Sequence, residues 1–159
     1  MTKTAQINLV VNGEKYFENV PVRMNLADFL RNKLGLTGTH VGCEHGVCGA
    51  CTIFLDGVTA RSCLTLAVQA DETEVITIEG YETDKNASDL IKNFHKRNAL
   101  QCGYCTPGML ASSIEYIERG NPPDRKKVKE HISGNYCRCT GYQAIVDAIC
   151  TTIEERQSR

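Results

Sequence analysis

The nine cysteines of this 159-residue chain constrain its fold more than any other feature. Residues 1–11 contain no continuous apolar region and no small-residue cleavage site, so we expect no signal peptide and a cytoplasmic location. Thiols in that reducing compartment are rarely held as disulfides, and a dense set of them favours metal binding. The cysteines predict two four-thiolate sites and one spare thiol, because they fall into two groups and a single residue: Cys43, Cys48, Cys51 and Cys63; Cys102, Cys105, Cys137 and Cys139; and Cys150.

The first group has the spacing C-x4-C-x2-C, followed by a fourth cysteine after eleven residues. Its first three positions match the arrangement of plant-type ferredoxins, which bind a [2Fe–2S] cluster. The segment 42–51 is rich in glycine, so its backbone can approach an inorganic core closely and direct N–H groups at sulfur. These groups stabilise an anionic cluster, and we predict a [2Fe–2S] site here. A Rieske centre would need a second histidine at a spacing comparable with His45, and the sequence has none.

The second group has the spacing C-x2-C, then 31 residues, then C-x-C. Each pair precedes a segment with helical periodicity, so its thiolates would lie near a helix N-terminus, where partial positive charge favours an anion. Structural zinc also takes four thiolates, and spacing alone leaves zinc open at this second site. Zinc fits the first site poorly, because its ligands usually come as two C-x2–4-C pairs. Beside a ferredoxin-type first site, we predict a second [2Fe–2S] cluster.

The first half of the chain has the pattern of a small α+β sheet. Apolar residues alternate over 5–11, and Asn12-Gly13 favours a tight hairpin into a returning strand around 16–20. Asn25 is a suitable N-cap for a helix that extends to Leu34. We expect the remaining strands at 52–55, 58–61 and 74–78, the first two joined by the turn Asp56-Gly57.

The second half has helical periodicity throughout, and we expect four helices packed as a small bundle around the cysteines. Ser88 is the candidate cap of the first, and Thr106 is the candidate cap of the second, with Pro107 in its first turn. Asp124 opens the third, and the last runs from about 142 to 155. The polar segment 79–87 separates the two halves. We therefore predict two domains, 1–80 with the sheet and 81–159 with the helices.

Composition argues against several classes of partner and activity. The net charge is −1 and the longest basic run is Arg125-Lys126-Lys127, so we expect no nucleic-acid partner. No apolar stretch approaches the roughly 20 residues of a membrane helix, so we expect no membrane span. The sequence contains no Ser–His–acid arrangement, paired-carboxylate motif or phosphate loop, which places substrate chemistry on another chain. Cys150 borders an apolar helical face and is expected to be a buried, inert thiol.

Three segments together resemble the iron–sulfur subunit of the molybdenum hydroxylases, the xanthine oxidase and carbon monoxide dehydrogenase family. They are GCEHGVCGACT at 42–52, QCGYCTPG at 101–108 and GNYCRCTGY at 134–142. The resemblance covers nearly the whole chain, in order. It implies a β-grasp plant-type ferredoxin domain followed by a C-terminal four-helix bundle, each binding one [2Fe–2S] cluster.

The resemblance also implies a function and partners. It implies an electron-transfer subunit of an oxidoreductase that relays electrons from a molybdopterin (molybdenum) site on a large subunit to FAD on a medium subunit. The assembly would be a heterotrimer, often dimerised, and the isolated chain is expected to have no substrate turnover. The helical-domain cluster would lie nearest the pterin, whose edge Gln101 and Cys139 would contact. From the residues alone, Gln101 is better explained as an uncharged residue that satisfies backbone near the cluster.

Two other functions stay open: a stand-alone two-cluster ferredoxin and a zinc-stapled interaction module. Freely diffusing carriers often use a strong charge field for steering, so the near-zero net charge and the long helical part argue against the first. Iron and acid-labile sulfide analysis separates the zinc module from the others, and co-purification of flavin and molybdenum separates the remaining two. The sequence does not distinguish among purines, other N-heterocycles, aldehydes, CO and aromatic CoA thioesters as substrates of the complex.

Overall fold

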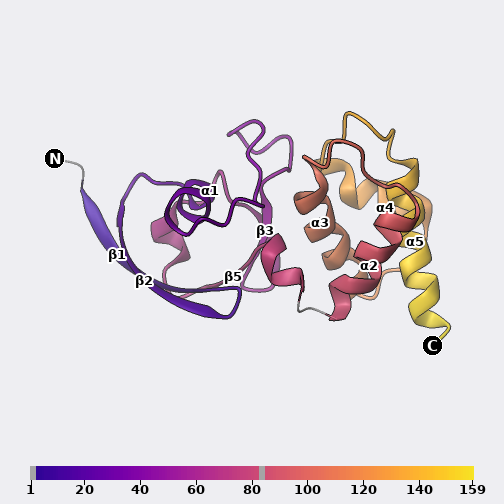
Figure 1. Cartoon of the computed structure of the whole chain (residues 1–159), viewed down its shortest axis with the longest axis horizontal. Coiled ribbons are helices and arrows are strands. Elements are labelled where there is room, and N and C mark those ends of the chain that lie inside the picture. Colours follow the sequence, from indigo (N-terminus) through magenta and orange to yellow (C-terminus); the bar gives the residue numbers. More distant parts are fainter. Residues whose placement is uncertain (1–2, 83–84) are drawn as a thin grey trace.

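The computed structural model describes residues 3–82 and 85–159, with a sheet at one end and helices at the other (Figure 1). Strands β1 (Thr4–Val11) and β2 (Glu14–Pro21) form the antiparallel hairpin predicted from Asn12-Gly13. A second hairpin joins β3 (Thr52–Leu55) to β4 (Val58–Arg61). Strand β5 (Glu74–Ile76) lies between the hairpins, parallel to β1 and antiparallel to β3. The result is a mixed sheet of order β2-β1-β5-β3-β4, as expected for a [2Fe–2S] ferredoxin-like α+β fold.

A short helical segment packs on this sheet. Helix α1 (Leu26–Asp28) continues as a π-helical turn over Phe29–Lys33. Asn25 caps it as predicted, because its Oδ1 accepts a hydrogen bond from Asp28 N at 2.7 Å. The apolar side of the segment is fully buried against inward-facing residues of the strands, forming a core that includes Leu26, Phe29, Leu30, Ile7, Leu9, Val11, Ile53 and Val75.

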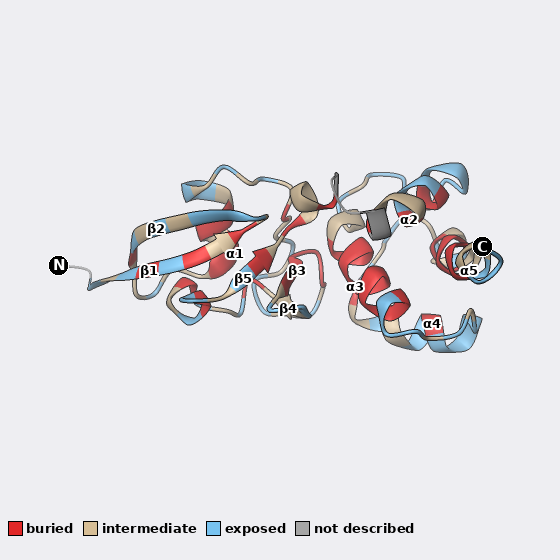
Figure 2. Cartoon of the chain, turned by 90° about the horizontal axis from the view of Figure 1, so that it is seen from below, coloured by how far each residue is buried: buried red, intermediate tan, exposed pale blue. Residues whose placement is uncertain are grey.

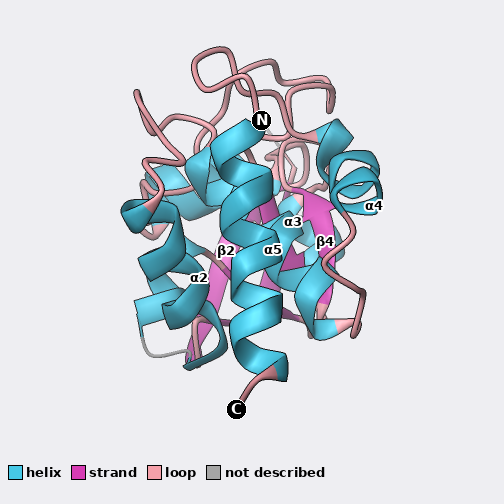
Figure 3. Cartoon of the chain, turned by 90° about the vertical axis from the view of Figure 1, so that its right-hand side faces the viewer, coloured by secondary structure: helices cyan, strands magenta, loops and turns pink. Residues whose placement is uncertain are grey.

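The second half consists of four of the five α-helices found within the described residues (Figures 1 and 3). They are α2 (Lys85–Lys96), α3 (Thr106–Glu118), α4 (Arg125–His131) and α5 (Gln143–Gln157). Helix α3 is buried over most of its length (Figure 2), because it contacts β3 and β4 as well as the other three helices. None of the described helices combines the length and the apolar character that crossing a membrane requires.

Three predicted element ends are wrong. Helix α2 begins at Lys85, so Ser88 lies inside the helix and not at its N-cap. Helix α3 begins one residue earlier than predicted, with Thr106 in its first turn. Strand β5 stops at Ile76 because Thr77 N donates to the side chain of Asn12 instead of continuing the ladder.

The segment predicted as a linker, 79–87, is more ordered than its polar composition indicates. A 3-10 helix at Ile78–Glu82 and the first turn of α2 occupy most of it, and residues 83–84 lie outside the described part of the chain. Tyr81, in this 3-10 helix, is buried in the helical core beside Phe54 of β3, with ring centroids 6.4 Å apart. The described part of this segment before residue 83 is therefore packed into the structure.

Candidate iron–sulfur sites

The first four cysteines are brought together by the loop before β3 and the turn after β4. Cys48 N donates to Cys43 Sγ at 3.4 Å, and the two thiols are also hydrogen-bonded to one another. Cys51 immediately precedes β3 and Cys63 follows β4, and the antiparallel pairing of these strands brings the two thiols into hydrogen-bond contact. The first site thus consists of two neighbouring pairs of thiols.

Backbone N–H groups surround the sulfur of Cys43. Hydrogen bonds from the N–H of Cys48, and then from that of His45, lower the pKa of Cys43 to about 6. The loop can direct these groups at sulfur because Glu44 and Gly46 adopt left-handed backbone conformations, with φ of 59° and 83°. Cys43 is consequently a thiolate at neutral pH, the form that binds metal. Burial raises the pKa of Cys63 to about 11, so metal binding there must displace a proton.

The second four cysteines lie in the loops that precede α3 and α5. Cys102 Sγ and Cys139 Sγ are 3.5 Å apart, and Cys105 and Cys137 are also hydrogen-bonded to one another. Burial raises the pKa of Cys105 to about 12. Burial also acts to raise the pKa of Cys137, but hydrogen bonds led by the Thr140 hydroxyl lower it overall. The second site repeats the arrangement of the first, with two pairs of thiols.

This paired arrangement fits a [2Fe–2S] cluster better than a single metal ion. In such a cluster each iron takes two thiolates, so four sulfurs surround two metal positions. Structural zinc instead takes all four thiolates around one ion. All eight cysteines are free of disulfides, as ligation requires. The number of thiols, their pairing and the directed N–H groups all suit two clusters.

Hydrogen bonds join the two sites directly. Tyr136 N donates to Cys48 O at 2.8 Å, which links the residue before Cys137 to a cysteine of the first site. Tyr104, between the first two cysteines of the second site, donates its hydroxyl to Val41 O at 2.8 Å. Each cysteine loop is therefore in contact with the other, although they are far apart in sequence.

Close packing fixes the separation of these loops. Asn135 is 2% exposed, and its Nδ2 donates to Gly49 O at 3.0 Å and to Thr52 Oγ1 at 3.2 Å. Gly108, in the first turn of α3, lies so close to the first loop that a Cβ atom there would be 2.1 Å from Gly49 O. No side chain fits between α3 and this loop, so glycine is required at position 108.

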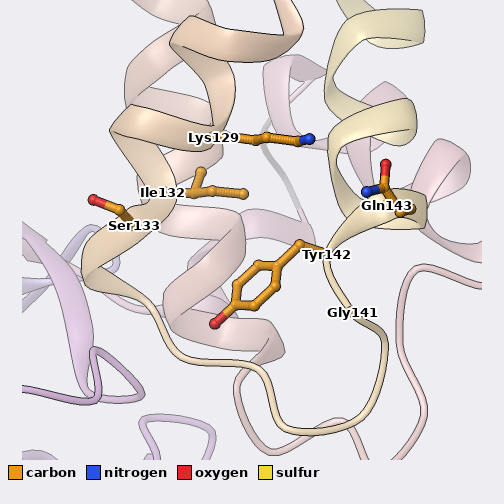
Figure 4. A pocket seen from close by; sticks show the side chains of 6 residues that line it. All are labelled: Lys129, Ile132, Ser133, Gly141, Tyr142 and Gln143. Atoms are coloured by element: carbon orange, nitrogen blue, oxygen red, sulfur yellow. The ribbon is translucent and has the colours of Figure 1, made fainter.

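Tyr142 holds the second loop from the beginning of α5. Its backbone is left-handed, with φ of 67°, and its phenol oxygen accepts a hydrogen bond from Cys137 N at 2.8 Å. Figure 4 shows the ring extending below Ile132 in a pocket of about 400 Å3. The pocket lies beside the cysteine loop and contains none of the eight thiols, since its lining residues are Lys129, Ile132, Ser133, Gly141, Tyr142 and Gln143.

Comparison with known proteins agrees with this organisation. The family described as "2Fe-2S iron-sulfur cluster binding domain" matches residues 9–80, and that described as "[2Fe-2S] binding domain" matches residues 77–150. The chain is 52% identical over 147 residues to caffeine dehydrogenase subunit gamma of Pseudomonas sp. (strain CBB1), a match that covers 90% of this chain and 87% of that protein. It is 50% identical over 144 residues to the nicotine 6-hydroxylase small subunit of Paenarthrobacter nicotinovorans, covering 91% and 87%.

A solved structure matches the whole fold as well. One chain of quinoline 2-oxidoreductase from Pseudomonas putida 86 superimposes with a TM-score of 0.90 at 46% identity, covering 98% of this chain and 97% of that one. The chain belongs to the iron–sulfur subunits of the molybdenum hydroxylases. The family prediction from the three cysteine motifs is thereby confirmed, and so is the presence of two [2Fe–2S]-binding domains in this iron–sulfur subunit.

The two residues predicted to contact the pterin lie together in this molybdenum hydroxylase subunit. Gln101 Nε2 donates to Cys139 O at 3.2 Å, and both residues are exposed. Cys102 and Cys139 are exposed at the second site, whereas Cys51 and Cys63 are buried at the first. The second site therefore presents part of its thiol set at the protein surface.

Sequence reasoning missed the residues that support the cysteines. Asn135, Thr140 and Tyr142 lie within or beside the third motif, but their contacts with Gly49 and Cys137 arise only when the loops are folded together. The available signal was their position: each is a hydrogen-bonding side chain within five residues of a cysteine pair. His45 remains an exposed loop residue, as predicted, with Nδ1 2.5 Å from Cys43 O.

Proposed function

We propose that this subunit relays electrons from a molybdopterin site on a large partner subunit to FAD on a medium partner subunit. The observation that carries the proposal is the pair of four-thiol sites joined by the hydrogen bond from Tyr136 N to Cys48 O. Each [2Fe–2S] cluster, when bound, accepts and releases one electron. The chain itself binds and spaces the two clusters, and we expect no substrate turnover by the isolated subunit.

The ligand assignment follows the thiol pairs. Within each site, the two thiols in contact would share one iron: Cys43 with Cys48 and Cys51 with Cys63, then Cys102 with Cys139 and Cys105 with Cys137. The lowered pKa values of Cys43 and Cys137 support this, since each site then has a thiol that is easily ionised. All eight positions are assigned by this pairing, and Cys150 is not, because it is buried in the helical core.

We assign the first cluster to a β-grasp domain at 1–80 and the second to a four-helix bundle at 81–159. Separate hydrophobic cores support this division, one around Phe29 and Leu9, and one around Met109 and Ile149. Helices α2, α4 and α5 all contact α3, as the helices of a small bundle would. The two family matches also meet near residue 80.

Exposure at the second site supports the proposed orientation of the relay. Gln101 and Cys139 would face the molybdopterin, because they are adjacent and at the surface. Leu100, Tyr104 and Tyr136, which are close in sequence to the cysteines of this site, are exposed large side chains suited to a contact with the large subunit. The first site would then face the FAD subunit. Relatives named as gamma and small subunits support larger partners, and we propose a dimer of heterotrimers in the cytoplasm, where nine free thiols stay reduced.

Metal analysis of the purified subunit is the first test. We expect about four irons and four sulfides per chain and two distinguishable EPR signals on reduction, because the ligand loops differ in exposure. The cluster assignment would be refuted if the chain, reconstituted anaerobically with iron and sulfide, took up zinc alone and showed no visible charge-transfer colour.

The order of the relay is tested by Cys139→Ser and Cys48→Ser in the assembled complex. A serine oxygen is a harder ligand than a thiolate and suits an iron–sulfur core less well, so each variant should damage one cluster. N-heterocycles are the first substrates to use, since relatives are named for caffeine, nicotine and quinoline. In stopped-flow absorbance with freeze-quench EPR, Cys139→Ser should block reduction of both the remaining cluster and the flavin. Cys48→Ser should leave reduction of the second site intact and block only the flavin.

The opposite pattern would reverse the proposed order. In that outcome, Cys48→Ser would lose the first electron transfer from molybdenum, and Cys139→Ser would still reduce the first site normally. Subunit assembly and iron content must be measured for both variants before the kinetics, because losing a cluster destabilises the loops that bind it.

A further inference from the structure

The Thr140 hydroxyl lies against a sulfur of the second site. Thr140 Oγ1 is 3.1 Å from Cys137 Sγ, and the same oxygen accepts a hydrogen bond from Tyr142 N at 3.2 Å. When Cys137 is a thiolate ligand its sulfur has no proton, so the hydroxyl must be the donor in this contact. The Tyr142 N–H occupies a lone pair of the hydroxyl oxygen and leaves its single proton free to point at sulfur.

The backbone around Thr140 keeps this hydroxyl in place. Tyr142 adopts a left-handed conformation, which is unfavourable for a non-glycine residue and persists only where its surroundings impose it. The same residue accepts from Cys137 N through its phenol oxygen at 2.8 Å. The short segment from Cys137 to Tyr142 is thus tied at both ends, with the Thr140 hydroxyl held between them.

The two sites differ in how their sulfurs are hydrogen-bonded. At the first site, the backbone N–H groups of Cys48 and His45 donate to Cys43. A side-chain substitution does not remove such backbone donors. At the second site, a side-chain hydroxyl supplies one of the donors to Cys137. That donor can be removed without changing the number of backbone donors or the four thiols.

We propose that Thr140 is a positioning residue whose hydroxyl raises the reduction potential of the cluster at the second site. Reduction adds negative charge to the cluster and its thiolates, and a hydrogen bond strengthens as its acceptor becomes more negative. The hydroxyl therefore stabilises the reduced state more than the oxidised state. A higher potential at the second site favours the acceptance of electrons there, which sets the driving force for the onward step to the first site.

This inference rests on the proposed cluster at the second site, and the test separates the two. Thr140→Val removes the hydroxyl at nearly constant volume, Thr140→Ser keeps it, and Thr140→Ala provides a smaller hydroxyl-free partner for the serine variant. The iron and sulfide content of each purified complex is measured first. The proposed function itself would be refuted if the wild-type complex had no cluster at the second site. EPR-monitored redox titration then gives the potential of each cluster separately.

We expect Thr140→Val to weaken reduction of the second cluster by about tenfold, which is ~59 mV for a one-electron couple, and to leave the first cluster unchanged. Thr140→Ser should restore the wild-type potential, and Thr140→Ala should resemble valine. An unchanged potential in Thr140→Val, or an equal fall in Thr140→Ser, overturns the proposal. Loss of the cluster from both valine and alanine variants also overturns it, because the hydroxyl would then be needed to hold the loop.

Discussion

Replacing Asn135 by alanine tests whether the contact between the cysteine loops stabilises the fold. Asn135 precedes the loop of Cys137 and is buried between that loop, α3 and the first cysteine loop. Its side chain is joined by hydrogen bonds to Ser112 on α3, Gly49 in the first cysteine loop and Thr52 at the start of β3. The alanine side chain removes all of these bonds and leaves the eight thiols unchanged.

The expected loss follows from those contacts. Ser112 Oγ donates to Asn135 Oδ1 at 2.8 Å, and Asn135 Nδ2 donates to Gly49 O at 3.0 Å and Thr52 Oγ1 at 3.2 Å. Each such bond contributes about 0.5–1.5 kcal/mol net, and a buried partner left unpaired costs more. Gly49 O retains the N–H and hydroxyl of Thr52, whereas the Ser112 hydroxyl, on a side chain 5% exposed, loses its acceptor. We therefore expect Asn135→Ala to reduce the free energy of unfolding by about 3 kcal/mol.

Thermal unfolding monitored by circular dichroism measures this loss. For a chain of this size, about 3 kcal/mol lowers Tm by about 6–12 °C. Asn121→Ala is the matched control. Among the described residues the Asn121 side chain makes one bond, from Nδ2 to Tyr116 O at 2.9 Å, so this variant should lose only about 1 kcal/mol of the free energy of unfolding. Equal Tm values for the two alanine variants would refute the reasoning, since the loop contact would then contribute no more than one partly buried bond.

Further predictions concern packing, pH and metal. Gly108→Ala brings a Cβ against Gly49 O, and we expect urea titration to show a loss of about 1–3 kcal/mol, whereas an unchanged midpoint would contradict the close approach. Burial acts to raise the pKa of Asp89, but Arg156 and Arg159 hold it below its usual value, so the native state binds this proton more weakly than the unfolded state. The stabilisation is then present at neutral pH and lost as pH falls through the folded pKa. Asp89→Asn should lower Tm at pH 7 by an amount that shrinks as the pH falls below the usual aspartate pKa, and a pH-independent difference would exclude the ion pair as its cause. Chelating the iron of the reduced subunit should lower its Tm, because ligand thiolates stabilise the fold through the metal, and calorimetry of apo and holo protein checks this.

Local features were predicted well because their requirements are local. Asn12-Gly13 and Asp56-Gly57 each supply two consecutive positive φ angles, which is what a tight two-residue hairpin needs. Asn25 and Asp124 cap α1 and α4 through bonds to N–H groups two or three residues away. These assignments needed no knowledge of the rest of the chain.

Features that depend on distant contacts were not predictable in the same way. The pairing of β1 with β5 joins segments more than 60 residues apart, and alternation within each strand says nothing about that partner. Strand β5 ends early because Asn12 binds Thr77 N across a similar distance. At the cysteine sites, spacing indicated the thiols, but the role of Thr140 depends on a left-handed Tyr142, which no residue pattern signals.

Part of the contact between the two halves is polar and directional, and this suits a subunit that must hold two sites at a fixed spacing. Glu115 of α3 is buried, and its carboxylate accepts from Thr59 N at 3.1 Å and Thr59 Oγ1 at 3.0 Å on β4, while Arg119 pairs with it at 2.9 Å. Phe54 of β3 adds an apolar contact by entering the helical core. Apolar surfaces tolerate small sliding movements, whereas hydrogen bonds weaken steeply when their geometry changes. The bonds of Glu115 at one part of the interface and of Asn135 at another therefore fix both the distance and the rotation between the sheet and the helices.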